Sequence, residues 1–183
     1  MTYKVHSIES APAAAKEVLE GVRKNFGFIP NLLGVMAEAP ALAKAYRTLA
    51  GLFEETSFSP TERQTVLLAI SSENGCTYCV AAHSVIAGMQ QVPQEVVGAI
   101  RDGVAINDSK LEALRQFAVA VNAKRGNVSD DDINQFFAAG YSPAQVLEVV
   151  LAVGFKTLSN FTNHITETPL DEAFSQARWT KAA

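Results

Sequence analysis

The segment SPTERQTVLLAISSENGCTYCVAAH, residues 59–83, predicts two consecutive helices joined by a tight turn. Ser59 at the N-cap, Pro60 at the first helical position and Glu62 two residues later form a strong helix start. Asn74-Gly75 is a turn signal, so the first helix should end just before it. The second helix should open at Gly75, end near Gly88, and carry two cysteines and a histidine. This pattern favours an all-α fold.

The rest of the chain carries the same kind of signal, with apolar residues at helical spacing behind helix-starting residues. It contains no alternating strand pattern and no hairpin dipeptide between apolar runs, and only residues 2–10 are a candidate for extended chain. We expect a single domain spanning residues 1–183, a length that allows a substantial core. Further helices are expected over residues 11–24, 31–37, 41–53, 93–100, 109–124, 129–139 and from 142 through 151.

One internal similarity has two interpretations. Residues 59–70 align without gaps on residues 142–153, and the same register places Cys76 opposite Ser159 and Cys79 opposite Thr162. The chain could hold a duplicated helix pair whose second, degenerate copy spans about residues 142–170 and lacks the thiols. Alternatively, two Ser-Pro helix starts followed by apolar sequence produce the match by chance. The sequence leaves both open.

Composition restricts the partners. The formal net charge is −4 and the basic residues are scattered, whereas a nucleic-acid-binding protein would carry a basic stripe. The N-terminus has no apolar signal-peptide run, and no apolar stretch is long enough to span a bilayer. We therefore expect a cytoplasmic protein with neither a nucleic acid nor a membrane partner. A hydrophobic content of 48% suggests that part of the surface is buried against other subunits, so we expect a homo-oligomer.

The motif Cys76-Thr77-Tyr78-Cys79 contains the only two cysteines of the chain, and His83 is one of three histidines. A disulfide across so short a loop removes little chain entropy, so the pair is not a structural staple. In a reducing compartment, a close cysteine pair is more often catalytic or metal-binding than structural. The motif therefore predicts a reversible redox couple.

Helical geometry assigns different roles to the two thiols. At about 100° per residue, Cys76, Cys79 and His83 fall within an arc of about 60°, while Tyr78 points away toward the core or a pocket wall. His83 lies four residues after Cys79, so its imidazole can reach that thiol and activate it. We expect Cys79 to attack an oxidant and become a sulfenic acid, which Cys76 resolves as a disulfide. An external reductant would then restore the dithiol.

Two other interpretations of the motif remain. Two cysteines and His83 provide only three ligands where tetrahedral zinc takes four, and His6 and His164 are distant in sequence, so we expect no metal and no cofactor. The thiols could instead be small buried core residues beside a core histidine. In that case the chain would be a redox-sensing or helical interaction module whose disulfide alters assembly.

The sequence around the motif resembles a known family. Asn74-Gly75-Cys76-x-Tyr78-Cys79-x-x-x-His83, preceded by Ser59-Pro60-Thr61-Glu62-Arg63, is similar to the core of the carboxymuconolactone decarboxylase/AhpD-like superfamily, in its peroxidase-related, alkylhydroperoxidase-type branch. The resemblance is sharpest over about residues 59–90, the redox core. It implies an AhpD-like helical bundle that assembles into trimers or hexamers.

The resemblance also implies an activity, that of a thiol-dependent peroxidase or disulfide reductase. Cys79 would be the peroxidatic and Cys76 the resolving cysteine, and His83 would relay protons. The substrate would be a hydroperoxide, and the electrons would come from an external thiol or dithiol reductant. The decarboxylase branch acts on a lactone without such a cysteine pair, so a lyase of that type is the weaker alternative.

Two positions depart from the family pattern. Gln64 stands where alkylhydroperoxidase has a relay glutamate, and Tyr78 stands where it has a histidine before the second cysteine. An amide cannot relay a proton as a carboxylate can. Glu62, Glu73 and His164 are the candidates to complete the relay.

Overall fold

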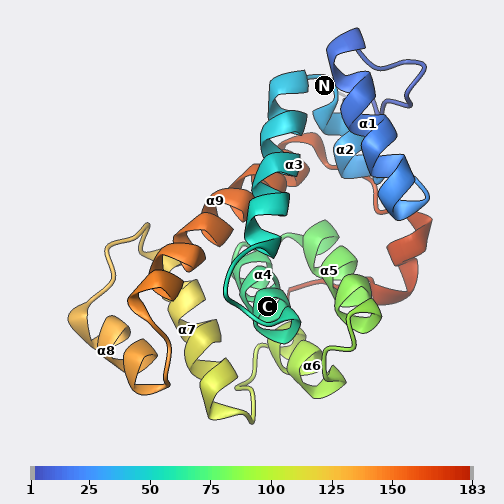
Figure 1. Ribbon diagram of the computed structural model, residues 1–183. Coiled ribbons are helices and arrows are strands. Elements are labelled where there is room, and N and C mark those ends of the chain that lie inside the picture. Colours follow the sequence, from blue (N-terminus) through green and yellow to red (C-terminus); the bar gives the residue numbers. More distant parts are fainter. Residues whose placement is uncertain (1–2, 182–183) are drawn as a thin grey trace.

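The computed structural model describes residues 3–181, which form α-helices and one short 3-10 helix, with no β-strand in this range (Figure 1). The predicted all-α fold is confirmed. The elements are α1 (Ala13–Phe26), α2 (Asn31–Met36), α3 (Pro40–Glu54), α4 (Pro60–Glu73), α5 (Thr77–Met89), α6 (Gln94–Asp102), α7 (Ser109–Ala123), α8 (Asp130–Ala138), α9 (Pro143–Thr166) and η1 (Glu172–Ala177).

Helices α4 and α5 form the predicted pair. The Ser59 hydroxyl accepts a hydrogen bond from the Glu62 backbone N–H, and the Glu62 carboxylate accepts one from the Ser59 N–H, which completes a capping box. Gly75 turns the chain with φ of +66°, a left-handed conformation that favours glycine. Because Gly75 is in this turn, α5 begins at Thr77 rather than at Gly75, and Cys76 is its N-cap residue.

Residues 142–170 do not form a second helix pair. The Ser142 capping box starts α9, but α9 then continues without a break for 24 residues. The positions that correspond to Asn74-Gly75 are Thr157 and Leu158, neither of which favours a left-handed turn. Of the two interpretations of the internal similarity, the continuous helix favours two Ser-Pro helix starts over a second helix–turn–helix copy.

Helix α4 lies at the centre of the bundle. It is buried from Gln64 through Ser71 and packs against α5, α6, α7 and α9. The long helix α9 crosses the molecule beside α3 (Figure 1). Its buried face contributes Phe155 to an aromatic cluster that also includes Phe53 and Phe136. Helix α5 belongs to a second cluster, with α1, α2 and η1. The thiol-bearing helix is thus held between the centre of the bundle and its C-terminal segment.

The terminal segments are anchored to the bundle. Residues 3–7 have no regular structure and residues 8–10 form a turn, so the described part of the expected extended segment contains no strand; residue 2 lies outside the described residues. Near the other end, the Trp179 indole donates a hydrogen bond to the Arg101 carbonyl, 2.8 Å away. None of the helices within residues 3–181 is by itself long and apolar enough to cross a membrane; only α8 and α9 together reach that length and composition, and they meet at a bend of 115°.

Candidate active site

The two thiols lie at the N-terminal end of α5 and are bridged by one residue of α9. Cys76 is 0% exposed and Cys79 is 2% exposed, and both are free thiols. The Asn163 amide Nδ2 donates to Cys79 Sγ at 3.2 Å and to Cys76 Sγ at 3.7 Å. Because one amide group reaches both sulfurs, the pair faces α9 side by side, as a couple that can close into a disulfide must.

The surroundings shift the pKa values of the two thiols in opposite directions. Burial alone would raise the pKa of Cys79, but a hydrogen bond from Cys76, the charge of Lys156 and the side chains of Ser159 and Asn160 together lower it well below its usual range. The hydrogen bond to Cys79 raises the pKa of Cys76, and burial raises it further. These opposite shifts favour the thiolate at Cys79 and the protonated thiol at Cys76, and the division of roles between the two stays a prediction.

His83 is buried in the site but does not contact Cys79 through a hydrogen bond. Its Nδ1 lies 3.0 Å from Gln64 Oε1, and its Nε2 lies 3.0 Å from the Lys156 Nζ, so both ring nitrogens are taken by other partners among the described residues. Burial, and then the charge of Lys156, lowers the pKa of His83 well below its usual value. The imidazole is thus neutral near pH 7, and the expected direct activation of Cys79 by His83 is not what the structure shows.

Lys156 is the site residue that the sequence analysis missed. It lies on α9 and is 0% exposed. An ammonium group donates hydrogen bonds and accepts none, so the Lys156 ammonium requires His83 Nε2 to be an acceptor and His83 Nδ1 to carry the proton. A signal was available: Lys156 is in helical register with three polar residues, Ser159, Asn160 and Asn163, and all four are buried on one face of α9.

Gln64 orients the histidine in place of the expected carboxylate. Its Oε1 accepts the His83 Nδ1–H, and its Nε2 donates to Gln90 Oε1 at 3.0 Å. Both contacts fix the orientation of the Gln64 amide in the same way, with its oxygen toward the His83 Nδ1–H and its nitrogen toward Gln90. Gln64 is therefore in the site as an acceptor that holds His83, although it cannot release a proton as a carboxylic acid does.

The other relay candidates lie outside the site. The Glu62 carboxylate is engaged in the capping box and lies 3.6 Å from the Lys110 ammonium. Glu73 and His164 are exposed, and it is Asn163, not its neighbour His164, that faces the thiols. These three predicted contributors are not brought to Cys79, because helix geometry turns each of them to another face.

Tyr78 connects α5 to distant parts of the chain. Its hydroxyl donates to the Asp171 carboxylate and accepts the Leu32 backbone N–H at 3.3 Å. Asp171 also accepts the Asn31 backbone N–H at 3.0 Å, at the start of α2. Burial, and then Asp171, raises the pKa of Tyr78, so the phenol stays protonated. Tyr78 points away from the thiols, as predicted, and its observed contacts are structural.

A cavity of about 250 Å³ reaches the site at Gln64 and His83. Gln64 and His83 line it, and Tyr46, Phe53 and Phe155 form its aromatic wall. Burial raises the pKa of Tyr46 and the negative charge of Cys79 raises it further, which places this wall close to the thiolate. The volume lies below the range typical of drug-sized ligands, so the cavity suits a small molecule.

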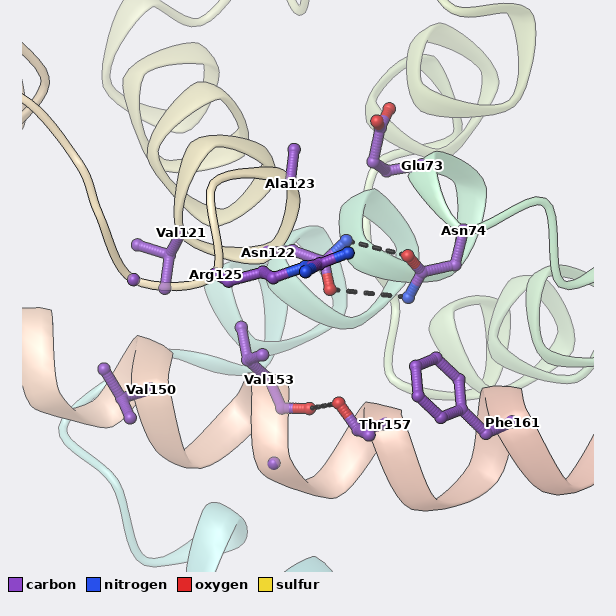
Figure 2. A pocket seen from close by; sticks show the side chains of 12 residues that line it. Glu73, Asn74, Val121, Asn122, Ala123, Arg125, Val150, Val153, Thr157 and Phe161 are labelled. Atoms are coloured by element: carbon purple, nitrogen blue, oxygen red, sulfur yellow. Dashed lines mark hydrogen bonds between the residues drawn. The ribbon is translucent and has the colours of Figure 1, made fainter.

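A larger cavity, of about 790 Å³, lies on the other side of α9 and is not lined by the thiols (Figure 2). Asn74 and Asn122 lie side by side in its lining, with Asn122 Nδ2 donating to Asn74 Oδ1 at 2.8 Å (Figure 2). Asn74 Nδ2 in turn donates to Asn160 Oδ1 at 2.9 Å. These amides form a polar layer between the large cavity and the side chains around Cys79, so the smaller cavity is the better candidate for a substrate.

The described residues offer no site for a metal ion built from their usual ligands. Within residues 3–181, no three His, Cys, Asp or Glu side chains are close enough together to hold one. The groups that surround the thiols are instead amide, hydroxyl, imidazole and ammonium groups.

Comparison with known proteins agrees with the resemblance. Residues 40–122 match the model of the carboxymuconolactone decarboxylase family. The matched segment runs from the start of α3 into α7 and contains both thiols, Gln64 and His83, whereas Lys156 and Asn163 lie beyond it. No curated protein is significantly similar to the chain in sequence.

Solved structures share the fold of the whole chain. A protein from Ralstonia eutropha JMP134, described as an alkylhydroperoxidase AhpD core and uncharacterized peroxidase-related protein, superposes with a TM-score of 0.82 at 20% identity, covering 98% of this chain and 97% of its own. An uncharacterized peroxidase-related protein from Silicibacter sp. TM1040 gives 0.80 at 18% identity, covering 97% and 96%.

A third similar structure carries a different activity in its name. A cysteine variant of the debrominase Bmp8, in complex with 2,3,4-tribromopyrrole, gives a TM-score of 0.76 at 20% identity, covering 90% of this chain and 89% of its own. At these identities the comparisons establish the AhpD-like fold and leave the reaction to be argued from the site.

Proposed function

We propose that this protein is a thiol-dependent peroxidase that reduces small hydroperoxides through Cys79 and Cys76. The observation that carries the proposal is the geometry of the pair: one amide of Asn163 holds both sulfurs, in surroundings that lower the pKa of Cys79 and raise that of Cys76. A thiolate is the nucleophile that attacks a peroxide, and a neighbouring thiol is what resolves the product. The cavity ending at His83 and Gln64 would receive the substrate.

The proposed reaction has three balanced steps. The Cys79 thiolate attacks the outer oxygen of the hydroperoxide; the S–O bond forms as the O–O bond breaks, and the departing alkoxide takes up one proton. The Cys76 thiol then attacks the sulfenic acid of Cys79; the S–S bond forms, the S–O bond breaks, and water leaves with the thiol proton. An external dithiol finally reduces the disulfide and becomes a disulfide itself. We place the cycle in a reducing compartment such as the cytoplasm.

Single-turnover kinetics of the reduced protein test this function. Wild type should consume one equivalent of hydrogen peroxide or cumene hydroperoxide and lose both free thiols. Cys79→Ser should consume none, whereas Cys76→Ser should consume one equivalent and stop at a sulfenic acid that a dimedone-type reagent traps. Equal consumption by wild type and Cys79→Ser would sink the proposal.

Reductive dehalogenation is a second candidate, favoured by the aromatic wall of the small cavity. Tyr46, Phe53 and Phe155 present ring surfaces to this cavity, and the debrominase has a similar fold. There, the Cys79 thiolate would attack the bromine, so that an S–Br bond forms as the C–Br bond breaks and the ring takes up a proton. The Cys76 thiol would then attack the Cys79 sulfur, forming the same disulfide and releasing bromide and a proton. Bromide release from 2,3,4-tribromopyrrole by the reduced protein, with no peroxide consumption, would favour this reaction over peroxide reduction.

Two alternatives that are not peroxidases, a redox sensor and a lyase, can be distinguished experimentally from the proposed function. A redox sensor would form the Cys76–Cys79 disulfide and change its assembly without rapid turnover, which size measurement with and without reductant would reveal. A lyase of the decarboxylase type would keep full activity on a lactone when both cysteines are replaced by serine.

We also propose that the chain forms a homo-oligomer, a trimer or hexamer, through the outer face of α9. Four large apolar side chains of this helix are more than half exposed: Leu147, Val150, Phe161 and Ile165. An exposed apolar face of this kind is typical of a subunit interface. Light scattering of wild type and a Phe161→Glu variant should show a larger particle for wild type.

A further inference from the structure

The buried ammonium of Lys156 lacks the counter-charge that such a group usually has. Within residues 3–181, no carboxylate lies within ion-pair distance of it. Its recorded neighbours are the neutral His83 imidazole and the ring of Phe155, whose centroid is 5.6 Å from the Nζ. Burying an unpaired charge is costly, so a lysine at 0% exposure requires a negative partner nearby.

The ionised thiol supplies that partner. The charged and titratable groups that act on Cys79 come from three helices: Cys76 on α5, Tyr46 on α3 and Lys156 on α9, and Lys156 in turn contacts His83 on α5. Lys156 is the cation among them, because His83 and Tyr46 are neutral and Cys76 keeps its proton. Lys156 also shares the buried face of α9 with Asn163, which contacts both sulfurs, so the ammonium and the thiolate lie in one interior site where their charges can neutralise each other.

We propose that Lys156 is both the counter-cation of the Cys79 thiolate and the source of the proton that His83 delivers to the leaving oxygen. This inference rests on the proposed peroxidase function. In it, Lys156 acts in place of the relay glutamate that was expected at the position of Gln64. Lys156 does not line the small cavity, whereas His83 and Gln64 do. Lys156 is thus a positioning and proton-supplying residue that acts through His83.

The hydrogen bonds give the relay a direction. Lys156 donates to His83 Nε2, and His83 Nδ1 carries a proton that points toward Gln64 at the cavity wall. When the departing alkoxide takes the Nδ1 proton, His83 Nε2 takes one from Lys156, and the imidazole stays neutral while it changes tautomer. The alcohol gains a proton, Lys156 becomes a neutral amine, and Cys79 becomes a neutral sulfenic acid.

The charges balance at each stage. Before the reaction, the site holds one negative sulfur and one positive nitrogen; afterwards it holds neither. A buried site would otherwise accumulate an uncompensated charge, at high cost. Reduction of the disulfide restores the negative charge on Cys79 and the positive charge on Lys156 together, since it produces a thiolate at Cys79 and a proton for Lys156.

The first test measures ionisation of Cys79 without any peroxide. The ultraviolet absorbance of the thiolate is followed against pH in reduced Cys76→Ser background proteins, with and without Lys156→Met. Lys156→Met should raise the midpoint by at least one pH unit, toward the ordinary value of about 8.5, and Lys156→Arg should keep it low. Lys44→Met, at an exposed position on α3, is the matched control and should leave it unchanged. An unchanged midpoint in Lys156→Met overturns the counter-cation role.

The second test isolates proton delivery. It is made at a pH where Cys79 is ionised in both wild type and Lys156→Met. The variant should reduce tert-butyl hydroperoxide about 100-fold more slowly than wild type, but peracetic acid at a similar rate, because the acetate leaving group needs no proton. If Lys156→Met slows the reduction of both peroxides equally, or slows neither, the proton relay is overturned. If wild type reduces neither peroxide yet the thiolate midpoint moves, the peroxidase function fails and the counter-cation role stands.

A third measurement needs no variant and covers the case in which Lys156→Met does not fold. Nitrogen NMR of histidine in the wild-type reduced protein should show His83 neutral near pH 7 with its proton on Nδ1. A proton on Nε2, or a charged ring, would contradict the path from Lys156 through His83.

Discussion

The α4–α5 pair and helix α9 start from the same Ser-Pro capping signal and then diverge. The first breaks at Gly75, and the break places Cys76 and Cys79 at a new helix N-terminus. The second continues for 24 residues and contributes Lys156 and Asn163 to those thiols from across the bundle. The comparison shows that a turn places the two thiols together, whereas an unbroken helix brings the polar groups that surround them.

The largest expected effect comes from imposing on α9 the break that α4–α5 contains. Leu158→Pro removes a helical hydrogen bond in the middle of α9 and should lower the free energy of unfolding by about 3 kcal/mol or more. Leu158→Ala removes the same side chain without that backbone change and is the matched control. Urea unfolding followed by circular dichroism measures both. A proline variant no less stable than the alanine variant would show that continuity of α9 is unimportant.

The next effect concerns the contact between the two regions. Asn163→Leu removes the amide that donates to both sulfurs, and a hydrogen bond to a charged group contributes about 1.5–3 kcal/mol. The Cys79 thiolate should therefore form about one to two pH units higher. His164→Leu, at the exposed neighbouring position, should have no effect on the thiolate absorbance curve. If the two variants behave alike, Asn163 does not stabilise the thiolate.

The two thiols should make stability depend on pH in opposite directions. The folded pKa of Cys79 is depressed, so its contribution is present above the unfolded value of about 8.5 and is lost as pH falls toward the folded pKa. The folded pKa of Cys76 is raised, so its contribution is lost as pH rises above about 8.5. Reduced wild type should be most stable near that pH, with a limiting slope of about 1.4 kcal/mol per pH unit per thiol.

The control for this pH dependence is the Cys76→Ser, Cys79→Ser double variant. Chemical unfolding at a series of pH values, under reducing conditions, gives the difference between the two proteins. A difference that stays constant across the neutral and mildly alkaline range would contradict the assigned pKa directions.

The smallest effect tests the turn itself. Gly75→Ala places a side chain at φ of +66° and should cost about 1 kcal/mol, because only glycine adopts this conformation freely. Gly21→Ala, inside α1 with no atom within 4 Å of the new methyl group, should instead stabilise the protein by a similar amount. Urea midpoints of the two variants should move in opposite directions; a shift of the same sign in both would show that the turn conformation does not matter.

The redox pair was predictable because its determinants are close in sequence. Capping residues, the Asn74-Gly75 turn and the Cys76, Cys79, His83 spacing all lie within one helix pair, where local geometry relates them directly. The relay was not predictable in the same way. Glu62, Glu73 and His164 were reasonable candidates by residue type, but the capping box engages the first and the other two are exposed.

By itself, the sequence determined the helices and the position of the cysteine pair, since these depend on short-range periodicity and residue identity. It also determined that position 64 carries an amide instead of the expected carboxylate. Only the tertiary structure decided what replaces that carboxylate. Lys156 and Asn163 reach the thiols because α9 packs against α5, more than 70 residues away along the chain, and burial then makes each nearby charge and amide effective on Cys79. Packing brings these groups together, and no local pattern records it.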